Sequence, residues 1–172
     1  GSVIINGGKI ANNTSASGGG IHNDKTITMT AGEISGNKST TGSGGGIYNG
    51  LNVVMSGGSI TGNIAKSDGG GINQGHILQV SEKVRISDNQ VDGGKASNVF
   101  LDHYSYDTEN PNCYITIVSP GLSSGSQIGV NINPDKDLDI TQAINDKDYS
   151  KYFTSDDSNY EIINVESNGK YQ

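Results

Sequence analysis

The chain has little cysteine, little arginine and no long apolar segment, and each shortage excludes a class of protein. Its 172 residues include one cysteine, Cys113, which excludes an internal disulfide framework and a zinc cluster. No apolar run approaches the roughly 18 residues of a membrane span. Eleven basic residues stand against 18 acidic ones, a net charge of −7. That balance disfavours nucleic acid as a partner, because phosphate binding needs a clustered basic surface.

Glycine, by contrast, is abundant and unevenly placed. Residues 1–100 hold 22 of the 26 glycines and carry seven basic against six acidic residues. Residues 101–172 hold the other four glycines and carry four lysines against 12 acids. The composition therefore divides the chain near residue 100 into a nearly neutral, glycine-rich part and an acidic part.

Three motifs recur with a step of 24 to 26 residues, and a shared register of this kind indicates a repeat architecture. The first motif is Gly-Gly-Gly-Ile, at Gly18–Ile21, Gly44–Ile47 and Gly69–Ile72. The second is an alternating apolar pair, Ile27/Met29, Val53/Met55 and Leu78/Val80. The third is Ile-x-x-Asn, at Ile10/Asn13, Ile34/Asn37, Ile60/Asn63 and Ile86/Asn89.

Such short segments, with apolar residues at alternate positions, indicate β-strands rather than helices. Glycine and asparagine at the joints supply the backbone conformations that sharp corners need. Three short strands per repeat make one turn of a parallel β-helix, whose turns stack about 4.8 Å apart. The predicted fold is all-β: a right-handed, single-stranded parallel β-helix of about five turns with a C-terminal cap. The hand follows the usual preference of parallel crossovers.

The asparagines of the third motif predict a ladder of amides inside the corner of the helix. Asn13, Asn37, Asn63 and Asn89 occupy one position of successive turns, so each amide should hydrogen-bond to the corner backbone and to the next asparagine. A second, imperfect ladder is expected from the polar residues that come after the first motif, Asn23, Asn49 and Gln74.

The repeats are expected to span residues 3–133. The last turn should carry two insertions, at 102–113 and 119–124, because its apolar motifs are spaced more widely than in the other turns. In that turn Gly93–Ala96 stands for the first motif, Ile115–Ile117 for the second, and Ile128 with Asn131 for the third.

Residues 134–172 are expected to form an acidic cap with a short helix near Thr141–Tyr152 and a strand at Tyr160–Val165. At the other end the first turn begins in mid-repeat, with Val3 and Ile5 in the places of Ile27 and Met29. Because natural proteins cover such an edge, we expect further turns upstream in a longer natural chain.

The repeats resemble those of right-handed β-helices in adhesin-like surface proteins of Gram-positive gut bacteria. The resemblance rests on GGGI-x-N, on MSGGSITGN (Met55–Asn63) and on DGGKASNVFL (Asp92–Leu101). The segment YSKYFTSDDSNYEI (Tyr149–Ile162) is similar to the segment after the last repeat in those proteins. The resemblance implies an extracellular protein at the bacterial cell surface, and it brings no catalytic residues with it.

Parallel β-helices also include polysaccharide lyases and glycoside hydrolases, so a carbohydrate-active enzyme is the alternative. A lyase needs a basic residue beside acids that hold Ca²⁺, and a hydrolase needs carboxylates at set separations on adjacent turns. Arg85 is the only arginine, and the acids of the repeats do not recur at one position of the turn. The spacings of a Ca²⁺-binding β-roll and of an EF-hand are also missing. The sequence therefore favours a non-catalytic module, a rigid stalk or an adhesive surface, with no metal site and no cofactor.

A binding site for a host glycan or protein is expected on the longer insertion, because recognition concentrates where a repeat is interrupted. His103, Tyr104 and Tyr106 could stack on a sugar or a peptide, and Asp107 could accept hydroxyl hydrogen bonds. The favoured alternative is that the two tyrosines anchor the loop against the cap. A second candidate for sugar binding is the outward row His22, Tyr48 and Asn73. These side chains are better interpreted as ordinary exposed residues.

Overall fold

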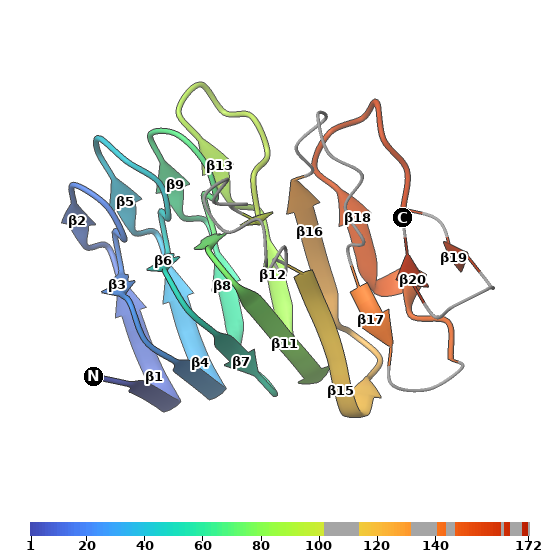
Figure 1. Cartoon of the computed structure of the whole chain (residues 1–172). Coiled ribbons are helices and arrows are strands. Elements are labelled where there is room, and N and C mark those ends of the chain that lie inside the picture. Colours follow the sequence, from blue (N-terminus) through green and yellow to red (C-terminus); the bar gives the residue numbers. More distant parts are fainter. Residues whose placement is uncertain (102–113, 132–140, 144–146, 163, 166–169, 172) are drawn as a thin grey trace, which may run out of the picture.

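The computed structural model describes residues 1–101, 114–131, 141–143, 147–162, 164–165 and 170–171. It is an all-β parallel solenoid of about five turns, which succeed one another along a single axis from the N-terminal end to the C-terminal end (Figure 1). Among the described residues the one helical element is a short 3₁₀ turn, η1 (Ser150–Tyr152). The parallel β-helix is thereby confirmed, and the hand of its winding stays a prediction.

A regular turn presents four faces, named here in chain order. The first face stacks β3 (Ile21–Asn23), β6 (Ile47–Asn49), β10 (Ile72–Gln74) and β14 (Val99–Leu101). The second stacks the N-terminal halves of β1 (Val3–Ala11) and β4 (Ile27–Ser35) with β7 (Val53–Met55), β11 (Ile77–Glu82), β15 (Tyr114–Leu122) and β17 (Thr141–Ala143).

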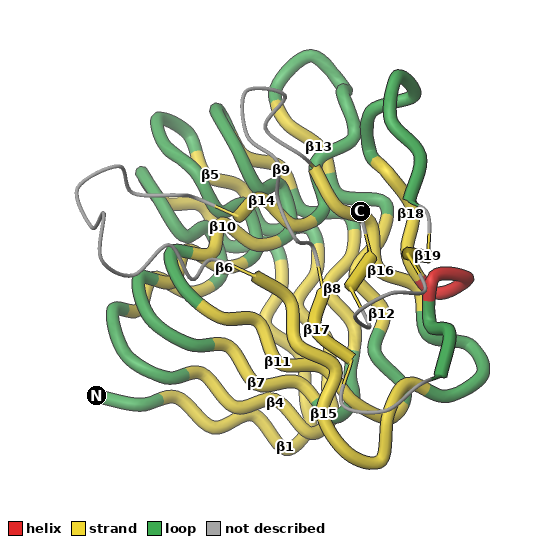
Figure 2. The backbone as a smooth tube through the Cα atoms, turned by 45° about the vertical axis from the view of Figure 1, so that its right-hand side comes forward, coloured by secondary structure: helices red, strands yellow, loops and turns green. Residues whose placement is uncertain are grey.

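The third face stacks the C-terminal halves of β1 and β4 with β8 (Ser59–Thr61), β12 (Arg85–Ser87), β16 (Gln127–Asn131) and β18 (Phe153–Ser155). The fourth face is a separate sheet of two-residue strands, β2 (Thr14–Ser15), β5 (Lys38–Ser39), β9 (Ile64–Ala65) and β13 (Gln90–Val91). All these pairings are parallel, and Figure 2 shows them as stacked strands joined by corner loops.

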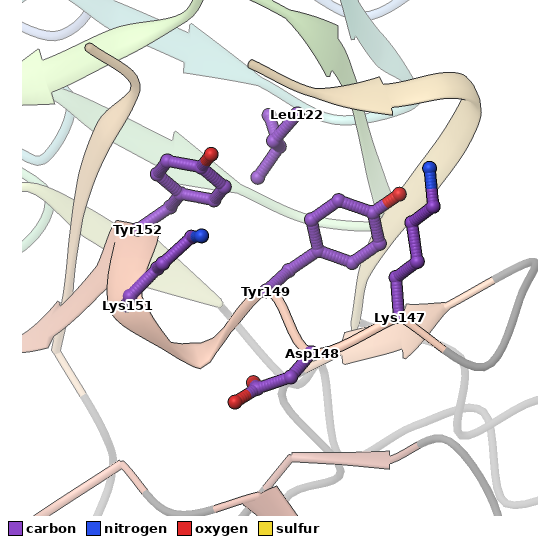
Figure 3. Close-up of a pocket in the computed structure, with 6 residues that line it drawn as sticks. All are labelled: Leu122, Lys147, Asp148, Tyr149, Lys151 and Tyr152. Carbon is purple, nitrogen blue, oxygen red and sulfur yellow. The ribbon is translucent and has the colours of Figure 1, made fainter. Parts of the chain in front are cut away.

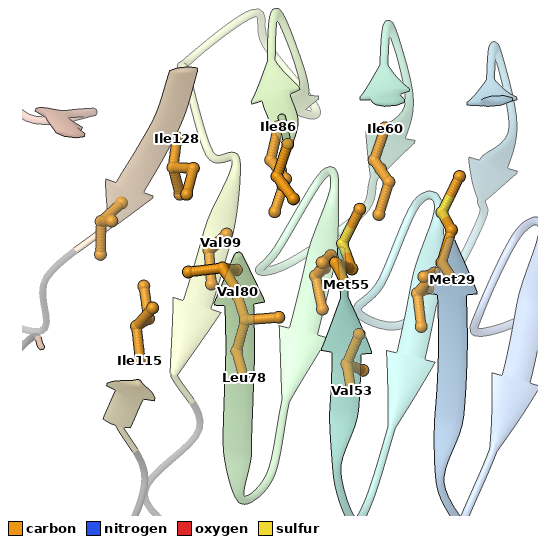
Figure 4. Packing of buried hydrophobic residues seen from close by; sticks show 14 of the residues in the cluster. Met29, Val53, Met55, Ile60, Leu78, Val80, Ile86, Val99, Ile115 and Ile128 are labelled. Atoms are coloured by element: carbon orange, nitrogen blue, oxygen red, sulfur yellow. The ribbon is translucent and has the colours of Figure 1, made fainter. Parts of the chain in front are cut away.

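The register of the turns is the one that the three motifs predict. Ile47 pairs with Ile21 and Ile72 on the first face, and Ile60 pairs with Ile34 and Ile86 on the third. Apolar side chains of successive turns point inward and stack in columns (Figure 4). Most are fully buried, including Ile27, Met29, Val53, Met55, Leu78, Ile86, Ile115 and Ile128. Burying these columns is the main favourable term in the folding free energy.

The fourth face is an addition to the three strands per turn that the sequence predicts. Its strands are two residues long and include polar pairs such as Thr14–Ser15 and Lys38–Ser39, so they show no apolar alternation. The buried hydroxyl of Ser39 donates to the carbonyl oxygens of Ala16 and Gly42, 2.9 Å from each. Short polar strands of this kind are invisible to hydrophobic periodicity.

Glycine is required in the first motif because successive turns touch there through their backbones. Gly44 has φ of 71°, a conformation that favours glycine. A Cβ on Gly45 would lie 2.5 Å from the carbonyl carbon of Ile64, and one on Gly46 would lie 2.7 Å from the oxygen of Gly71. A side chain at either position would push two turns apart.

The start of the fifth turn differs from its prediction. Val99, not Ala96, pairs with Ile72, so the residues in the places of the three glycines are 96–98. Gly93 and Gly94 instead belong to a tight turn after β13, in which the Gly94 amide donates to the oxygen of Val91. The prediction was wrong because glycine is needed equally at tight turns and at close backbone contacts, so the pair Gly93–Gly94 does not distinguish the two.

The cap also differs from its prediction. Residues 141–143 form strand β17, which pairs in parallel with β15, and η1 is the only helical turn described between 141 and 152. Strand β18 pairs in parallel with β16, so parallel pairing continues past residue 134. Edge backbone groups that the fifth turn offers are thus satisfied by further strands rather than by a helix.

The C-terminal end is closed by antiparallel strands. β20 (Lys170–Tyr171) pairs antiparallel to both β17 and β19 (Asn164–Val165), and the three lie together at the C-terminal end in Figure 1. Of the strand predicted at Tyr160–Val165, the described residues form only β19, and the Tyr160 amide closes a turn by donating to Asp157.

Candidate functional site

The predicted binding residues His103, Tyr104, Tyr106 and Asp107 lie outside the described residues, as do the rest of 102–113. The described chain fixes where this insertion starts and ends. It leaves β14 at Leu101, which is buried, and returns at Tyr114, which pairs with Ile77 of β11. The insertion therefore joins the first and second faces of the fifth turn.

The predicted asparagine ladder is present and has one direction. The amide N–H and the side-chain Nδ2 of each rung both donate to the Oδ1 of the next rung, at 2.9–3.0 Å. The same Nδ2 of Asn37, Asn63 and Asn89 also donates to a carbonyl of the preceding turn, at 2.8–2.9 Å. The last three rungs are fully buried. Each turn is thus bonded to the next through a polar column inside the apolar core.

The ladder ends in two residues that the sequence analysis missed. The backbone amide and Nδ2 of Asn89 donate to Oδ1 of Asn98, at 2.9 and 3.0 Å. The same two groups of Asn98 donate to the two carboxylate oxygens of Asp156, with Nδ2 2.6 Å from Oδ1. A carboxylate only accepts hydrogen bonds, so it ends a column of donors without needing a further partner.

Asn98 takes the place that the third glycine holds in other turns, next to the ladder corner. In those turns the corner asparagine supplies the rung, whereas Asn131 of the fifth turn pairs instead with Phe100. A Cβ on Gly129 would lie 2.5 Å from Oδ1 of Asp156, so glycine there makes room for the terminal pair. A polar side chain in a motif otherwise made of glycines is the signal that could have revealed Asn98.

Asp156 is half-buried. Burial raises its pKa above the ordinary 3.8, and the two hydrogen bonds from Asn98 oppose that shift without cancelling it. Its own amide donates to the Val130 oxygen at 2.9 Å, which fixes its backbone against β16. No sequence pattern links Asp156 to Asn98, because 58 residues separate them.

The second predicted ladder holds for one step only. Nδ2 of Asn23 donates to Oδ1 of Asn49 at 3.2 Å. At the next turn the longer Gln74 side chain turns away, and its Nε2 donates to the carbonyl oxygens of Leu51 and Ile77. Nδ2 of Asn49 is buried and has no hydrogen-bond partner among the described residues.

The outward row on the first face is in register, with His22, Tyr48, Asn73 and Phe100 on successive strands. The rings of His22 and Tyr48 stack on each other, with centroids 4.7 Å apart and planes inclined by 29°. Asn73 is only 2% exposed, so it interrupts the row. The row does not present a continuous aromatic surface to a sugar.

A hollow of about 360 Å³, called here the cap hollow, lies beside η1 (Figure 3). It is lined by Leu122, Lys147, Asp148, Tyr149, Lys151 and Tyr152. Tyr149 is buried with its hydroxyl against Gly121, and the Lys151 ammonium lies 5.2 Å from the centre of the Tyr152 ring. The Asp148 carboxylate points away from both tyrosine hydroxyls in Figure 3.

Asp148 is held in place by the chain itself. Its Oδ1 accepts a hydrogen bond from the Ser150 amide at 2.8 Å. Hydrogen bonds from the side chain and the backbone of Ser150, with a smaller contribution from Lys151, hold the pKa of Asp148 below its ordinary value. The carboxylate is therefore ionised at neutral pH, and its charge is already engaged at the start of η1.

A second hollow, the side groove, has a volume of about 430 Å³ and lies between turns at the second and third faces. It is lined by Gly58, Ser59, Lys83, Arg85 and Gly125. Arg85 donates to Ser87 and forms an ion pair with Asp88, both at 2.8 Å. Lys83 is exposed and forms no ion pair with any described residue. The Lys83 side chain lies over Gly125, where an added Cβ would come 2.9 Å from its Cε.

No described group of three or more His, Cys, Asp or Glu residues is arranged to hold a metal ion. None of the described helical segments is long and apolar enough to cross a membrane.

Comparison with known proteins gives no relative from which a role could be transferred. No family model, no curated protein and no solved structure matches the chain.

Proposed function

We propose that the chain is a non-catalytic module of a secreted or surface-anchored bacterial protein, in which the solenoid acts as a rigid stalk or as an adhesive surface. The resemblance of its repeats to adhesin-like surface proteins supports the location and the right-handed winding. The observation that carries the mechanical role is the unbroken ladder from Asn13 to Asp156, which bonds every turn to the next.

The ladder supports stiffness for a physical reason. Parallel strands already bond each turn to its neighbours through the backbone. The amide column adds bonds inside a core that excludes water, where an unpaired polar group costs roughly 1–3 kcal/mol. Separating two turns would break both sets at once, so bending or local opening of the rod is costly.

The proposed partner is a host glycan or protein. One proposed contact region is the insertion that carries His103, Tyr104, Tyr106 and Asp107. Changing Tyr104 and Tyr106 together to alanine distinguishes its two interpretations. Loss of glycan-array binding with an unchanged melting temperature would support a binding loop. A sharp fall in melting temperature would instead support the interpretation that the tyrosines anchor the loop.

The proposed function is tested by combining two measurements on the same protein. A glycan array should show retention of specific saccharides, and incubation with plant and mucosal polysaccharides should release neither reducing ends nor unsaturated products. Turnover of any polysaccharide would replace the proposal with the enzyme alternative. Binding to no array glycan, together with no turnover, would leave a rigid spacer without adhesive function.

A further inference from the structure

We propose that Asn6 is a site of spontaneous covalent modification, at which its side-chain amide is converted through a cyclic imide into aspartate and isoaspartate. The dipeptide Asn6–Gly7 lies in β1, at the N-terminal end of the stack in Figure 1. The inference is independent of the proposed function, because it concerns the chemistry of the chain and holds for a stalk, an adhesive surface or an enzyme alike.

The conversion needs only these two residues and water. The backbone nitrogen of Gly7 loses its proton and attacks Cγ of Asn6, the bond from Cγ to Nδ2 breaks, and the amide nitrogen leaves as ammonia. Water then opens the imide at either carbonyl carbon. Attack at Cγ gives aspartate, whereas attack at the backbone carbonyl carbon gives isoaspartate, in which the chain runs through Cγ. Glycine favours the first step, because it has no side chain to shield its nitrogen and its backbone turns freely.

The dipeptide lies in open solvent at an irregular point of β1. Asn6, Gly7 and Gly8 are exposed, and a Cβ added to either glycine would meet no atom within 4 Å. The pairing of β1 with β4 shifts register on both sides of Asn6, between it and Ile5 and between it and Lys9. Among the described strands β1 pairs with β4 alone. The backbone at Asn6 is therefore held less firmly than a strand that is paired regularly on both sides.

A neighbouring hydroxyl group activates the Asn6 amide. The Thr30 hydroxyl of the next turn donates to Oδ1 of Asn6 at 3.0 Å. This hydrogen bond draws electron density away from Cγ, the atom that is attacked. A donor in this position also stabilises the negative charge that develops on Oδ1 during the attack. Thr30 therefore favours the closure of the imide ring.

The chain contains the same dipeptide at a place where the fold protects it. Asn49 is 1% exposed, and its Oδ1 accepts a hydrogen bond from Asn23 at 3.2 Å. The Gly50 amide donates to the Asn23 carbonyl oxygen at 3.0 Å, so its nitrogen is not available for attack. Asn49 also belongs to β6, which is paired on both sides, with β3 and β10. The fold should therefore preserve Asn49 while Asn6 reacts.

The products should change the surface charge with little effect on the fold. Each product carries a carboxylate, so the net charge of −7 becomes more negative by one. Isoaspartate lengthens the backbone by one carbon, which in a regular strand would turn the following side chains toward the wrong face. β1 already contains an irregular step between Asn6 and Lys9, so Ile5 and Ile10 can keep their pairing with Met29 and Ile34.

The experiment follows the Asn-Gly pairs of the intact chain during incubation at mildly alkaline pH. Digestion with a lysine-specific protease places each pair on its own peptide, residues 1–9, 39–66 and 152–170. Liquid chromatography with mass spectrometry measures the conversion of each peptide to the acid. Asn6 is the only amide side chain in residues 1–9, so a gain of acid there is assigned without ambiguity. The third pair, Asn168–Gly169, lies outside the described residues.

We expect two acid products of equal mass from residues 1–9, formed at least roughly tenfold faster than acid at Asn49, which must wait for its turn to open. In urea that unfolds the chain the two rates should converge, because the dipeptides are identical. Thr30→Val removes the donor and should slow the conversion of Asn6 roughly threefold, as the loss of one exposed hydrogen bond predicts.

The matched control is Asn6→Gln, which keeps an exposed amide but would need a larger imide ring. It should leave the melting temperature unchanged and residues 1–9 without acid. Acid formed there as fast as in the unchanged chain would show direct hydrolysis and overturn the imide route. Persistence of Asn6 for as long as Asn49 in the folded chain would overturn the site itself. Faster conversion in Thr30→Val would show that the hydrogen bond restrains Asn6 instead of activating it.

Discussion

The regular turns and the C-terminal turns of this solenoid meet the same hydrogen-bonding demand in different ways. In the regular turns every rung is a corner asparagine, and glycines beside it let the next turn approach. In the last turns the rung comes from Asn98, at a glycine position, and the ladder ends on the Asp156 carboxylate. The comparison shows that every buried donor of the polar column needs an acceptor, whichever residue supplies it.

The two regions also differ in how they present their surface. The regular turns have short corners, whereas the last turns add the segment 119–126, the turn η1 and the antiparallel closing strands. The cap hollow and the side groove both take residues from this irregular region. Regular stacking leaves little freedom at the surface, and departures from it create concave sites.

The largest effect should come from adding a side chain where regular turns touch. Gly45→Ala places a Cβ 2.5 Å from the Ile64 carbonyl carbon, against rigid backbone, so we expect a loss of about 3 kcal/mol or more. Urea unfolding measures the loss. Gly50→Ala is the control, because its nearest atom is 3.2 Å away at the end of the Asp24 side chain. Equal losses would show that the turns do not touch at Gly45.

The next effect concerns a rung within the regular ladder. Asn63→Leu removes the acceptor of the Asn37 amide and Nδ2 and leaves them buried, so we expect a loss of about 3 kcal/mol. Asn13→Leu changes the exposed first rung and should cost about 1 kcal/mol or less. The neighbouring Asn12 is not suitable as a control for alanine substitution, because its φ of 58° is a conformation that disfavours alanine. Equal losses at Asn13 and Asn63 would contradict a buried ladder.

The terminal carboxylate offers a smaller effect with a defined pH dependence. Asp156→Ala leaves Asn98 without an acceptor and should cost about 2 kcal/mol, whereas Asp156→Asn keeps one acceptor and should cost less. Circular dichroism during urea unfolding measures both. An alanine variant as stable as the unchanged chain would show that the ladder does not need its carboxylate.

The pH dependence of that carboxylate comes from its raised pKa. Between the ordinary 3.8 and the raised value, the folded state binds more protons than the unfolded state. The Asp156 contribution to unfolding free energy should therefore fall as pH rises through this window. The difference in unfolding free energy between the unchanged chain and Asp156→Asn, measured across this pH range, isolates the contribution of the carboxylate. A difference that grows with pH would mean that the hydrogen bonds outweigh burial.

The smallest effect should come from a surface ion pair between regular turns. Lys66 Nζ lies 2.6 Å from Asp92, and about half of each side chain is exposed. Lys66 lowers the pKa of Asp92, so the contribution is present at neutral pH and lost as pH falls through that lowered pKa. Lys66→Gln should leave the melting temperature within experimental error, because solvent screens such pairs. A clear fall in the melting temperature of Lys66→Gln at low salt that vanishes at high salt would show that the ion pair contributes more to stability than expected.

The sequence by itself determined the all-β parallel solenoid, the register of the regular turns and the four asparagine rungs. It could do so because each turn contacts mainly its two neighbours, so the packing repeats with the sequence. Ile34, Ile60 and Ile86 pair because they occur once per repeat, and Asn37, Asn63 and Asn89 stack for the same reason.

The tertiary structure alone decided the contacts that do not repeat. Asn98 meets Asp156 across 58 residues, and Leu122 meets Tyr149 and Tyr152 across the cap hollow. Val99 rather than Ala96 continues the first face, because pairing with Ile72 fills the core column there. A repeat pattern encodes neighbours at a fixed spacing, whereas the ends are formed by whichever segments satisfy the exposed strand edges and the last donors of the ladder.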